Sequence, residues 1–192
     1  MQTLRVLGID PGTLKLGWGI VDSNTSIEFT RTASGCLNLG TTSTHIAERL
    51  SSLHLQLRGI LTEYSPNVVA IESAFFGDNA RSALRIGEAR GVVLMLAAEF
   101  GCEVVEIAPA TVKRRVAGNG RASKKQVFEM SVQHLDCGYF EPATEDESDA
   151  VAISLCHHME RSLAKATSNK THKKGAIIGG GRDKLPPGTT FQ

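Results

Sequence analysis

The hydrophobic residues change their spacing along the chain, and this change limits the folds that the sequence can adopt. Three strand-type stretches come first, at residues 5–9, 18–21 and 27–39, and turn sequences separate them. From residue 46 the apolar residues recur at helical spacing, and strand-type stretches at 68–71 and 103–107 alternate with helical ones. The helical stretches are predicted at 46–61, 79–100, 109–117, 123–135 and 144–165. This order of elements predicts an α/β fold.

We predict one mixed, five-stranded sheet flanked by helices, with three antiparallel strands followed by two parallel ones. Apolar residues make up 41% of the 192 residues, which is enough for an ordinary packed core. In such sheets the usable crevice lies beyond the carboxyl ends of the strands. The folded domain is predicted to span residues 1–164, and residues 165–192 are predicted to form a basic, Gly-rich, flexible tail.

The net charge of +1 conceals a division of charge along the chain. Residues 165–192 hold six Lys or Arg residues and one acid, which leaves a net charge of −4 on residues 1–164. Residues 113–125 hold six basic residues and no acid, whereas residues 141–149 hold five acids and no base. No apolar stretch approaches the ~20 residues of a membrane span, and the first residues do not resemble a signal peptide. We therefore expect a cytoplasmic protein without membrane contact.

Two acidic residues, Asp10 and Glu72, directly follow strand-type stretches. A carboxylate in that position is desolvated unless a positive charge balances it. Asp10 could instead cap the Pro-Gly turn that follows it, and Glu72 could belong to the solvated rim of the sheet. If the two strands are neighbours, both carboxylates lie at the same edge of the sheet.

A second pair of acids, Asp146 and Asp149, lies at the predicted start of the last helix. The i,i+3 spacing puts both on one face, and this face continues into apolar residues that should pack on the sheet. Thr144 and Glu147 fit a capping box, but that motif does not require Asp149. Four carboxylates in one crevice need cations, and their oxygen ligands suit Mg²⁺ or Mn²⁺. Two such ions about 3.5–4 Å apart would stabilise both the attacking and the leaving oxygens of a phosphoryl displacement.

Basic residues surround a Gly-Asn-Gly loop at 118–120, between two short predicted helices: Lys113, Arg114, Arg115, Arg121, Lys124 and Lys125. A cluster of this kind is often only a solvated face. The lack of acids within it favours contact with a phosphate backbone.

Two aromatic residues, Phe75 and Phe76, follow the candidate acid of the fourth strand. They could stack on an exposed base, or one of them could pack at the edge of the sheet. Three arginines on the next helix could add phosphate contacts, namely Arg81, Arg85 and Arg90. Arg85 is equally explained as an i,i+3 partner of Glu88.

Taken together, these residues resemble RuvC, the bacterial Holliday-junction resolvase family. The resemblance covers about residues 4–160 in four ordered blocks: LGIDPGT at 7–13 with GWG at 17–19, residues 71–91, residues 109–127, and DESDAVAI at 146–153. The opening block alone also begins sugar kinases and Hsp70-type ATPases, so the specificity lies in the four blocks as a set.

This resemblance implies a ribonuclease H-like fold, a homodimer, and Mg²⁺-dependent cutting of four-way DNA junctions in recombination and repair. The family's catalytic and metal-binding acids fall on Asp10, Glu72, Asp146 and Asp149. Its base-stacking aromatic residue falls on Phe75, and basic residues that approach the scissile strand fall on Lys113 and Lys124. The resemblance also implies work with a branch-migration complex of RuvA and RuvB.

We therefore expect an endonuclease with two Mg²⁺ ions per site, replaceable by Mn²⁺, in which a water attacks a backbone phosphorus in line. A two-fold dimer would place two such sites on opposed strands. DNA contacts are expected from Phe75, Arg81, Lys113, Arg114, Arg121, Lys124 and Lys125. Two alternatives remain: a ribonuclease H-like nucleotide phosphotransferase or ATPase, suggested by the opening motif, and a junction-binding protein that does not cut.

Overall fold

The computed structural model describes residues 3–25, 27–73, 80–136 and 140–175. Its sheet contains β1 (Leu4–Pro11), β2 (Lys15–Ser23), β3 (Thr30–Asn38), β4 (Val68–Glu72) and β5 (Glu103–Ile107). The strands lie in the order β3-β2-β1-β4-β5. β2 pairs antiparallel with both β1 and β3, whereas β4 pairs parallel with β1 and β5 pairs parallel with β4. The predicted mixed sheet is therefore confirmed, although its third strand begins at Thr30 rather than at residue 27.

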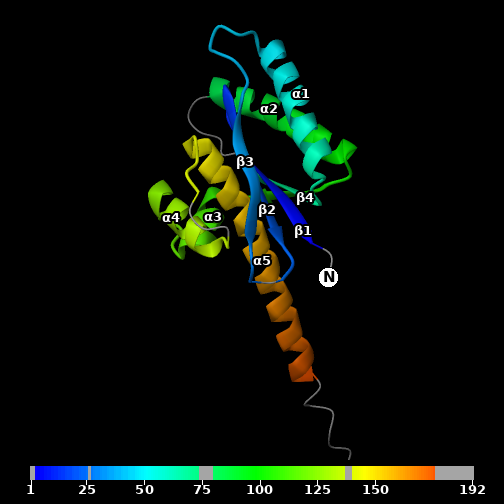
Figure 1. Ribbon diagram of the computed structural model, residues 1–192, viewed down its shortest axis with the longest axis vertical. Helices are drawn as coiled ribbons and strands as arrows, with labels where there is room; N and C mark the ends of the chain where they lie inside the picture. Colours follow the sequence, from blue (N-terminus) through cyan, green and yellow to red (C-terminus); the bar gives the residue numbers. More distant parts are fainter. Residues whose placement is uncertain (1–2, 26, 74–79, 137–139, 176–192) are drawn as a thin grey trace, which may run out of the picture.

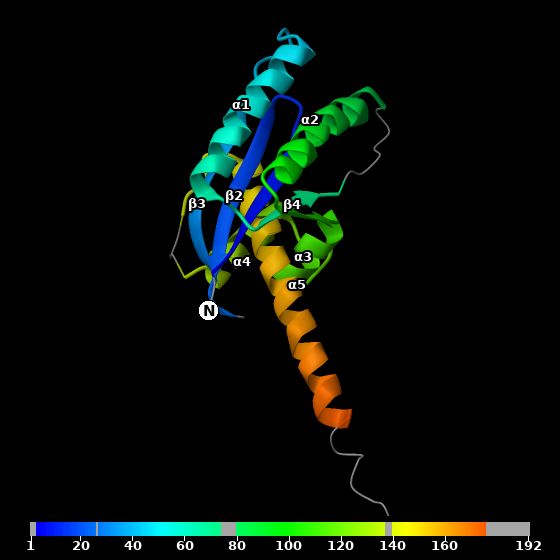
Figure 2. The ribbon, with the colours of Figure 1, turned by 90° about the vertical axis from the view of Figure 1, so that its right-hand side faces the viewer.

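Helices cover both faces of the sheet (Figures 1 and 2). They are α1 (Ile46–Tyr64), α2 (Ala80–Glu99), α3 (Pro109–Ala117), α4 (Lys124–His134) and α5 (Glu145–Gly175). Leu7 and Ile9 of β1 join the core that α1 and α2 cover, whereas Val6 joins the core on the side of α3, α4 and α5. Alternate residues of β1 therefore face opposite cores, as the pleat of a strand requires. By this alternation Asp10 lies on the same side of the sheet as α5.

The long helix α5 lies directly against β1 and β2, because glycines leave room for its backbone. A Cβ added at Gly8 would lie 2.1 Å from the carbonyl oxygen of Ala150, and one at Gly17 would lie 1.9 Å from that of Asp146. Both distances are far below van der Waals contact, so any side chain at these positions would displace the helix. The glycines thereby fix how closely the first turn of α5 approaches the sheet.

Helix α5 continues beyond the sheet to Gly175 (Figure 1), whereas the sequence predicts its end near Lys165. The prediction of the helix end was wrong, since residue 175 is the first Gly or Pro after Pro142 and nothing earlier breaks the helix. The division into a domain at 1–164 and a tail at 165–192 stays a prediction. No helix in the described ranges has the length and apolarity needed to cross a bilayer.

Candidate active site

Two of the predicted acids lie side by side at the carboxyl ends of neighbouring parallel strands. β1 and β4 pair in parallel with Ile9 opposite Ile71, so Asp10 and Glu72 occupy the next position of each strand. On its other side Asp10 pairs with Gly17 of β2. The predicted convergence of these two carboxylates at one edge of the sheet is therefore a consequence of strand register.

The start of α5 brings the other two acids to the same edge. The main chain of Asp146 packs on Gly17, the residue that pairs with Asp10, and Asp149 lies one turn further along the helix. Strand β1, strand β4 and helix α5 are far apart in sequence, yet they deliver carboxyl groups to one place. Packing of α5 on the glycines is what joins the two acid pairs.

The electrostatics of the site follow from this crowding. Burial, together with the charges of Glu72, Asp149 and Asp146, raises the pKa of Asp10 to about 7. Burial is also the largest cause that raises the pKa of Glu72, and the charge of Asp149 acts in the same direction. The nearby Lys124 opposes both pKa shifts. The site therefore holds more negative charge than its own surroundings neutralise.

Lys124, at the start of α4, supplies a positive charge within this acidic group. Its ammonium nitrogen lies 2.6 Å from Oδ2 of Asp149 and 3.4 Å from Oε2 of Glu145. Lys113 of α3 stands near Glu72, whose pKa its charge lowers, and both lysines line a cavity of about 210 Å³ together with Glu72 and Asp149. The two lysines predicted to approach a scissile strand therefore flank the carboxylates.

The side chains at this site suit a hard divalent cation, because Mg²⁺ and Mn²⁺ prefer carboxylate oxygens as ligands and the half-buried pocket is negatively charged. Within the described ranges no three acidic, imidazole or thiol side chains are already arranged to hold an ion. Asp149 faces an ammonium group instead. The half-buried Asp10 lies among the negative charges of Glu72, Asp149 and Asp146, which raise its pKa, and a divalent cation bound there would balance these charges.

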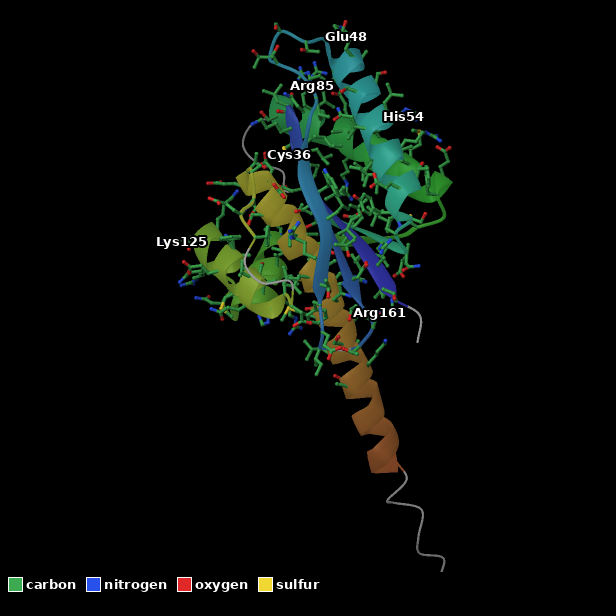
Figure 3. All side chains as sticks on the ribbon, in the orientation of Figure 1. Cys36, Glu48, His54, Arg85, Lys125 and Arg161 are labelled. Atoms are coloured by element: carbon green, nitrogen blue, oxygen red, sulfur yellow. The ribbon has the colours of Figure 1, made fainter. Side chains whose placement is uncertain are left out.

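The remaining residues predicted to bind DNA have different surroundings. Arg114, Arg121 and Lys125 are exposed, and Lys125 lies at the outer side of α4 (Figure 3). Its ammonium nitrogen is 3.9 Å from Glu129, a contact of little energetic weight. Arg81 lies in α2, where its side chain is not described, and Phe75 lies outside the described residues, as does its neighbour Phe76.

The other basic residues considered from sequence have structural partners. Arg85 pairs with Glu88 at 2.9 Å, which confirms the i,i+3 alternative, and Arg115 pairs with Glu160. Arg90 pairs with Glu106 and donates to the main-chain carbonyl oxygen of Glu72 at 3.2 Å. Arg90 therefore fastens the end of β4, where a candidate acid lies, to the helix that follows it.

Sequence reasoning missed two groups that hold the site together. The first is Gly17, which the sequence analysis names only as part of the GWG motif. A glycine inside a strand is itself a sign that another main chain approaches the strand closely, and here that chain is α5. Glu147 was assigned to a capping box. The hydroxyl of Thr144 does accept from the main-chain nitrogen of Glu147, at 3.1 Å, but the carboxylate also reaches Ser34 of β3. No sequence pattern signals this second contact.

The strand order, with acids at the carboxyl ends of β1 and β4 and at the start of α5, defines an α/β protein of the ribonuclease H-like class. The family model for "Crossover junction endodeoxyribonuclease RuvC" matches residues 6–157. The chain therefore belongs to the RuvC family of crossover junction endodeoxyribonucleases.

The similarity to individual RuvC proteins extends over nearly the whole length of each of them. The chain is 42% identical over 159 residues to the RuvC endonuclease of Roseiflexus sp. (strain RS-1), covering 82% of this chain and 92% of that protein. It is 38% identical over 165 residues to that of Dehalococcoides mccartyi (strain 195), covering 86% and 98% respectively. T. thermophilus RuvC in complex with Holliday junction substrate has a similar structure, with a TM-score of 0.78 and 30% identity over 84% of this chain and 96% of that one.

Proposed function

We propose that this protein resolves four-way DNA junctions by paired, metal-dependent hydrolysis of phosphodiester bonds, with Asp10, Glu72, Asp146 and Asp149 as its catalytic acids. The observation that carries the proposal is the convergence of these carboxylates beside two lysines at one edge of the sheet. A RuvC structure of similar fold is described as a complex with a Holliday junction substrate. No comparable observation favours nucleotide phosphotransfer or binding without cleavage.

The four acids would hold two Mg²⁺ ions, for which Mn²⁺ can substitute. Bound there, such ions supply Lewis-acid activation of a water and charge stabilisation of the departing 3′ oxygen. The protein's own contribution is position: β1 and β4 fix two carboxylates, and α5 presents the other two. Phosphoryl transfer asks mainly for positioning and charge stabilisation, which matches what this site offers.

Basic groups around the acids would hold the DNA backbone. Lys113 and Lys124 come from different helices and line the same cavity, so a phosphate there would meet positive charge from two directions. Arg114, Arg121 and Lys125 are exposed and belong to the same basic segment, and they would extend the contact along a strand. Phe75 remains a proposed DNA contact because of the family resemblance, and Arg81 remains one because it lies on the helix that follows the fourth strand.

A cleavage assay on a synthetic four-way junction tests the proposal directly. We expect paired nicks in opposed strands with Mg²⁺, none with a chelator, and little cutting of a linear duplex of the same sequence. Equal cutting of junction and duplex would contradict structure selectivity. Binding of the junction without any cutting at millimolar Mg²⁺ or Mn²⁺ would favour the alternative of a protein that only binds.

Two cuts require two active sites, and the four proposed catalytic acids of one chain form a single site. We therefore propose a homodimer. Helix α2 presents an exposed apolar stripe that suits a second copy: Leu84, Gly87, Gly91 and Met95. Leu84 is 62% exposed and Met95 52% exposed. A Cβ at either glycine would meet nothing within 4 Å, so a second helix can approach closely there. A two-fold axis through this stripe would pair α2 with itself.

Replacement of Gly91 by glutamate is expected to weaken the dimer at least about 100-fold, because it would bury an unpaired charge between the two helices. Sedimentation over a range of concentrations measures the change. Gly59→Glu on the exposed face of α1 is the matched control, since its Cβ also meets nothing within 4 Å. A Gly91→Glu variant that stays dimeric at the wild-type concentration would place the interface elsewhere.

Lys124 and a divalent cation would compete for Asp149. We expect Lys124→Met to bind Mn²⁺ roughly twofold to fivefold more tightly in the absence of DNA, the effect of removing a partly exposed ion pair worth about 0.4–1 kcal/mol. Lys125→Met is the matched control, because the ammonium group of this neighbouring lysine pairs with Glu129 instead. Isothermal titration of the DNA-free proteins measures both constants. Equal Mn²⁺ affinity in the two variants would show that Lys124 does not shield the site.

Two further parts of the proposal rest on the family resemblance. One is a partnership with RuvA and RuvB, which would deliver junctions by branch migration. The other is a cytoplasmic location, where recombining bacterial DNA is found. Co-sedimentation of the protein with RuvA and RuvB on a synthetic junction would test the first.

A further inference from the structure

Glu147 lies in sequence between the two proposed metal-binding acids of α5, and its carboxylate is buried. Its residue is 7% exposed, and both oxygens have partners. Oε1 accepts a hydrogen bond from the hydroxyl of Ser34 at 2.6 Å, and Oε2 accepts one from the main-chain nitrogen of Ala143 at 2.8 Å. The first contact reaches β3, and the second reaches the loop before α5. This side chain therefore ties the start of the helix to two other parts of the fold.

The contact with Ser34 continues into a charged group. Arg31 of β3 donates to the Ser34 hydroxyl at 3.0 Å, so its positive charge lies one hydrogen bond away from the buried carboxylate. The guanidinium group also lies over the ring of Phe140, 4.6 Å from its centroid. Arg31, Ser34 and Glu147 thus connect β3 both to the loop before α5 and to the first turn of the helix.

Glu147 points in a different direction from the acids beside it in sequence. At about 100° per residue, Glu147 lies about 100° around the helix from Asp146 and about 160° from Asp149. Its oxygens are committed to Ser34 and Ala143, at β3 and the preceding loop. Glu147 is therefore placed to hold the helix rather than to join the acidic group.

The first turn of α5 is held on two sides. On one side the main chain of Asp146 packs on Gly17 of β2, and on another Glu147 is bonded to Ser34 of β3. The first turn of a helix otherwise frays, because its main-chain N–H groups have no partners within the helix. A fixed first turn would present its acids without an ordering cost when a cation binds.

We propose that Glu147, acting through Ser34, is a positioning residue that fixes Asp146 and Asp149 in a metal-binding arrangement. The proposal rests on the proposed function, because it assigns these two acids to a cation. Loss of the Glu147 carboxylate leaves the Ser34 hydroxyl and the Ala143 N–H without this hydrogen-bond acceptor, and the first turn of α5 is then free to move. Loss of an outer hydrogen bond that orients a ligand typically weakens metal affinity by about 10–100-fold.

Titration of the DNA-free protein with Mn²⁺ tests the inference. Glu147→Ala is expected to raise the Mn²⁺ dissociation constant at least about tenfold. Glu147→Gln removes the charge but keeps a side chain of the same shape that can accept from Ala143 and donate to Ser34, so it should bind Mn²⁺ within about threefold of wild type. Ser34→Ala removes one of the two hydrogen bonds to Glu147, together with the bond that Arg31 donates to Ser34, and we expect an intermediate effect. If Glu147→Ala does not fold, the Mn²⁺ affinity of Ser34→Ala tests the inference in its place.

Ser154→Ala is the control for a merely structural effect. The Ser154 hydroxyl is buried and bonds the main-chain oxygen of Val6 at 2.9 Å, so its loss also weakens the packing of α5 on the sheet. Its unfolding temperature should fall, while its Mn²⁺ affinity should match wild type. The junction affinity of all variants, measured in a chelator, should stay unchanged.

The outcomes separate the inference from the proposed function. Normal Mn²⁺ affinity in folded Glu147→Ala and Ser34→Ala would overturn the positioning role alone. A Glu147→Gln variant as weak as Glu147→Ala would also overturn it, because charge rather than anchoring would then control the affinity. Failure of the wild type to bind Mn²⁺ or to cut a junction would overturn the proposed function, and the inference with it.

Discussion

Asp10→Asn is expected to abolish junction cleavage while the protein continues to bind the junction. The amide keeps the size of the side chain but removes the negative charge that a divalent cation needs. We expect cleavage to fall at least about 10²–10³-fold, a loss typical of removing one main electrostatic contact from an active site. The basic groups of α3 and α4 stay in place, so junction affinity in a chelator should change little. Single-turnover cleavage and gel-shift titration measure the two quantities.

The same substitution is expected to stabilise the metal-free protein at high pH. The pKa of Asp10 is about 7 in the folded protein, compared with 3.8 for an ordinary aspartate. As pH rises from about 4 to about 7, the unfolded state therefore loses its proton first, and the free energy of unfolding decreases. At pH 8 the asparagine variant avoids this loss, which we put at roughly 1–3 kcal/mol after allowing for residual solvent.

Thermal unfolding in a chelator checks this effect on stability. At pH 8 the unfolding temperature of Asp10→Asn should exceed that of wild type by about 3–10 °C, and the difference should vanish near pH 4. Added Mg²⁺ should stabilise the wild type more than the variant. Asp136→Asn, in an exposed turn, is the control and should behave as wild type. Wild-type cleavage by Asp10→Asn would refute the assignment of the site.

Gly17→Ala is expected to abolish cleavage although it changes no charged group. The added methyl would lie 1.9 Å from the carbonyl oxygen of Asp146, so the first turn of α5 must move away from β2. The move carries Asp146 and Asp149 away from Asp10. We expect cleavage to fall at least about 100-fold, since small misplacements of a catalytic group have effects of that size. Overpacking should also destabilise the fold by about 1–3 kcal/mol.

Gly59→Ala in α1 is the control for this glycine substitution. Its Cβ meets nothing within 4 Å, so the alanine should leave cleavage unchanged and stabilise the helix by roughly 0.5–1 kcal/mol. The cleavage rate is measured well below the unfolding temperature of each variant. If Gly17→Ala is folded and cuts at the wild-type rate, the close approach of α5 does not set the position of its acids.

The fold was largely predictable because periodicity is a local property. The strand-type and helical spacing of the apolar residues predicted the order of the five strands and the helices along the chain, and turn sequences separate the first three strands. The end of α5 was misplaced because residues 165–175 carry basic and small residues but no helix breaker before Gly175. The composition of these residues is typical of a flexible tail and therefore predicted an earlier helix end. None of them before Gly175 prevents the main chain from staying helical.

The candidate acids were predictable for a different reason. A carboxylate directly after a buried strand, or on the apolar side of a helix, conflicts with its surroundings and is visible in the sequence. The partners of the basic residues were not visible in this way. Arg90 binds the carbonyl oxygen of Glu72, and Lys124 binds Asp149, because tertiary packing brings these elements together.

The sequence by itself determined the order of strands and helices along the chain and membership of the RuvC family, and it supplied the four candidate acids. Only the tertiary structure decided how the acids are held. Gly17 and Ser34 lie more than 110 residues before the α5 residues that they contact, and no spacing along the chain encodes such contacts. They arise from strand register and from how closely a helix can approach the sheet, and both are settled only when the chain has packed.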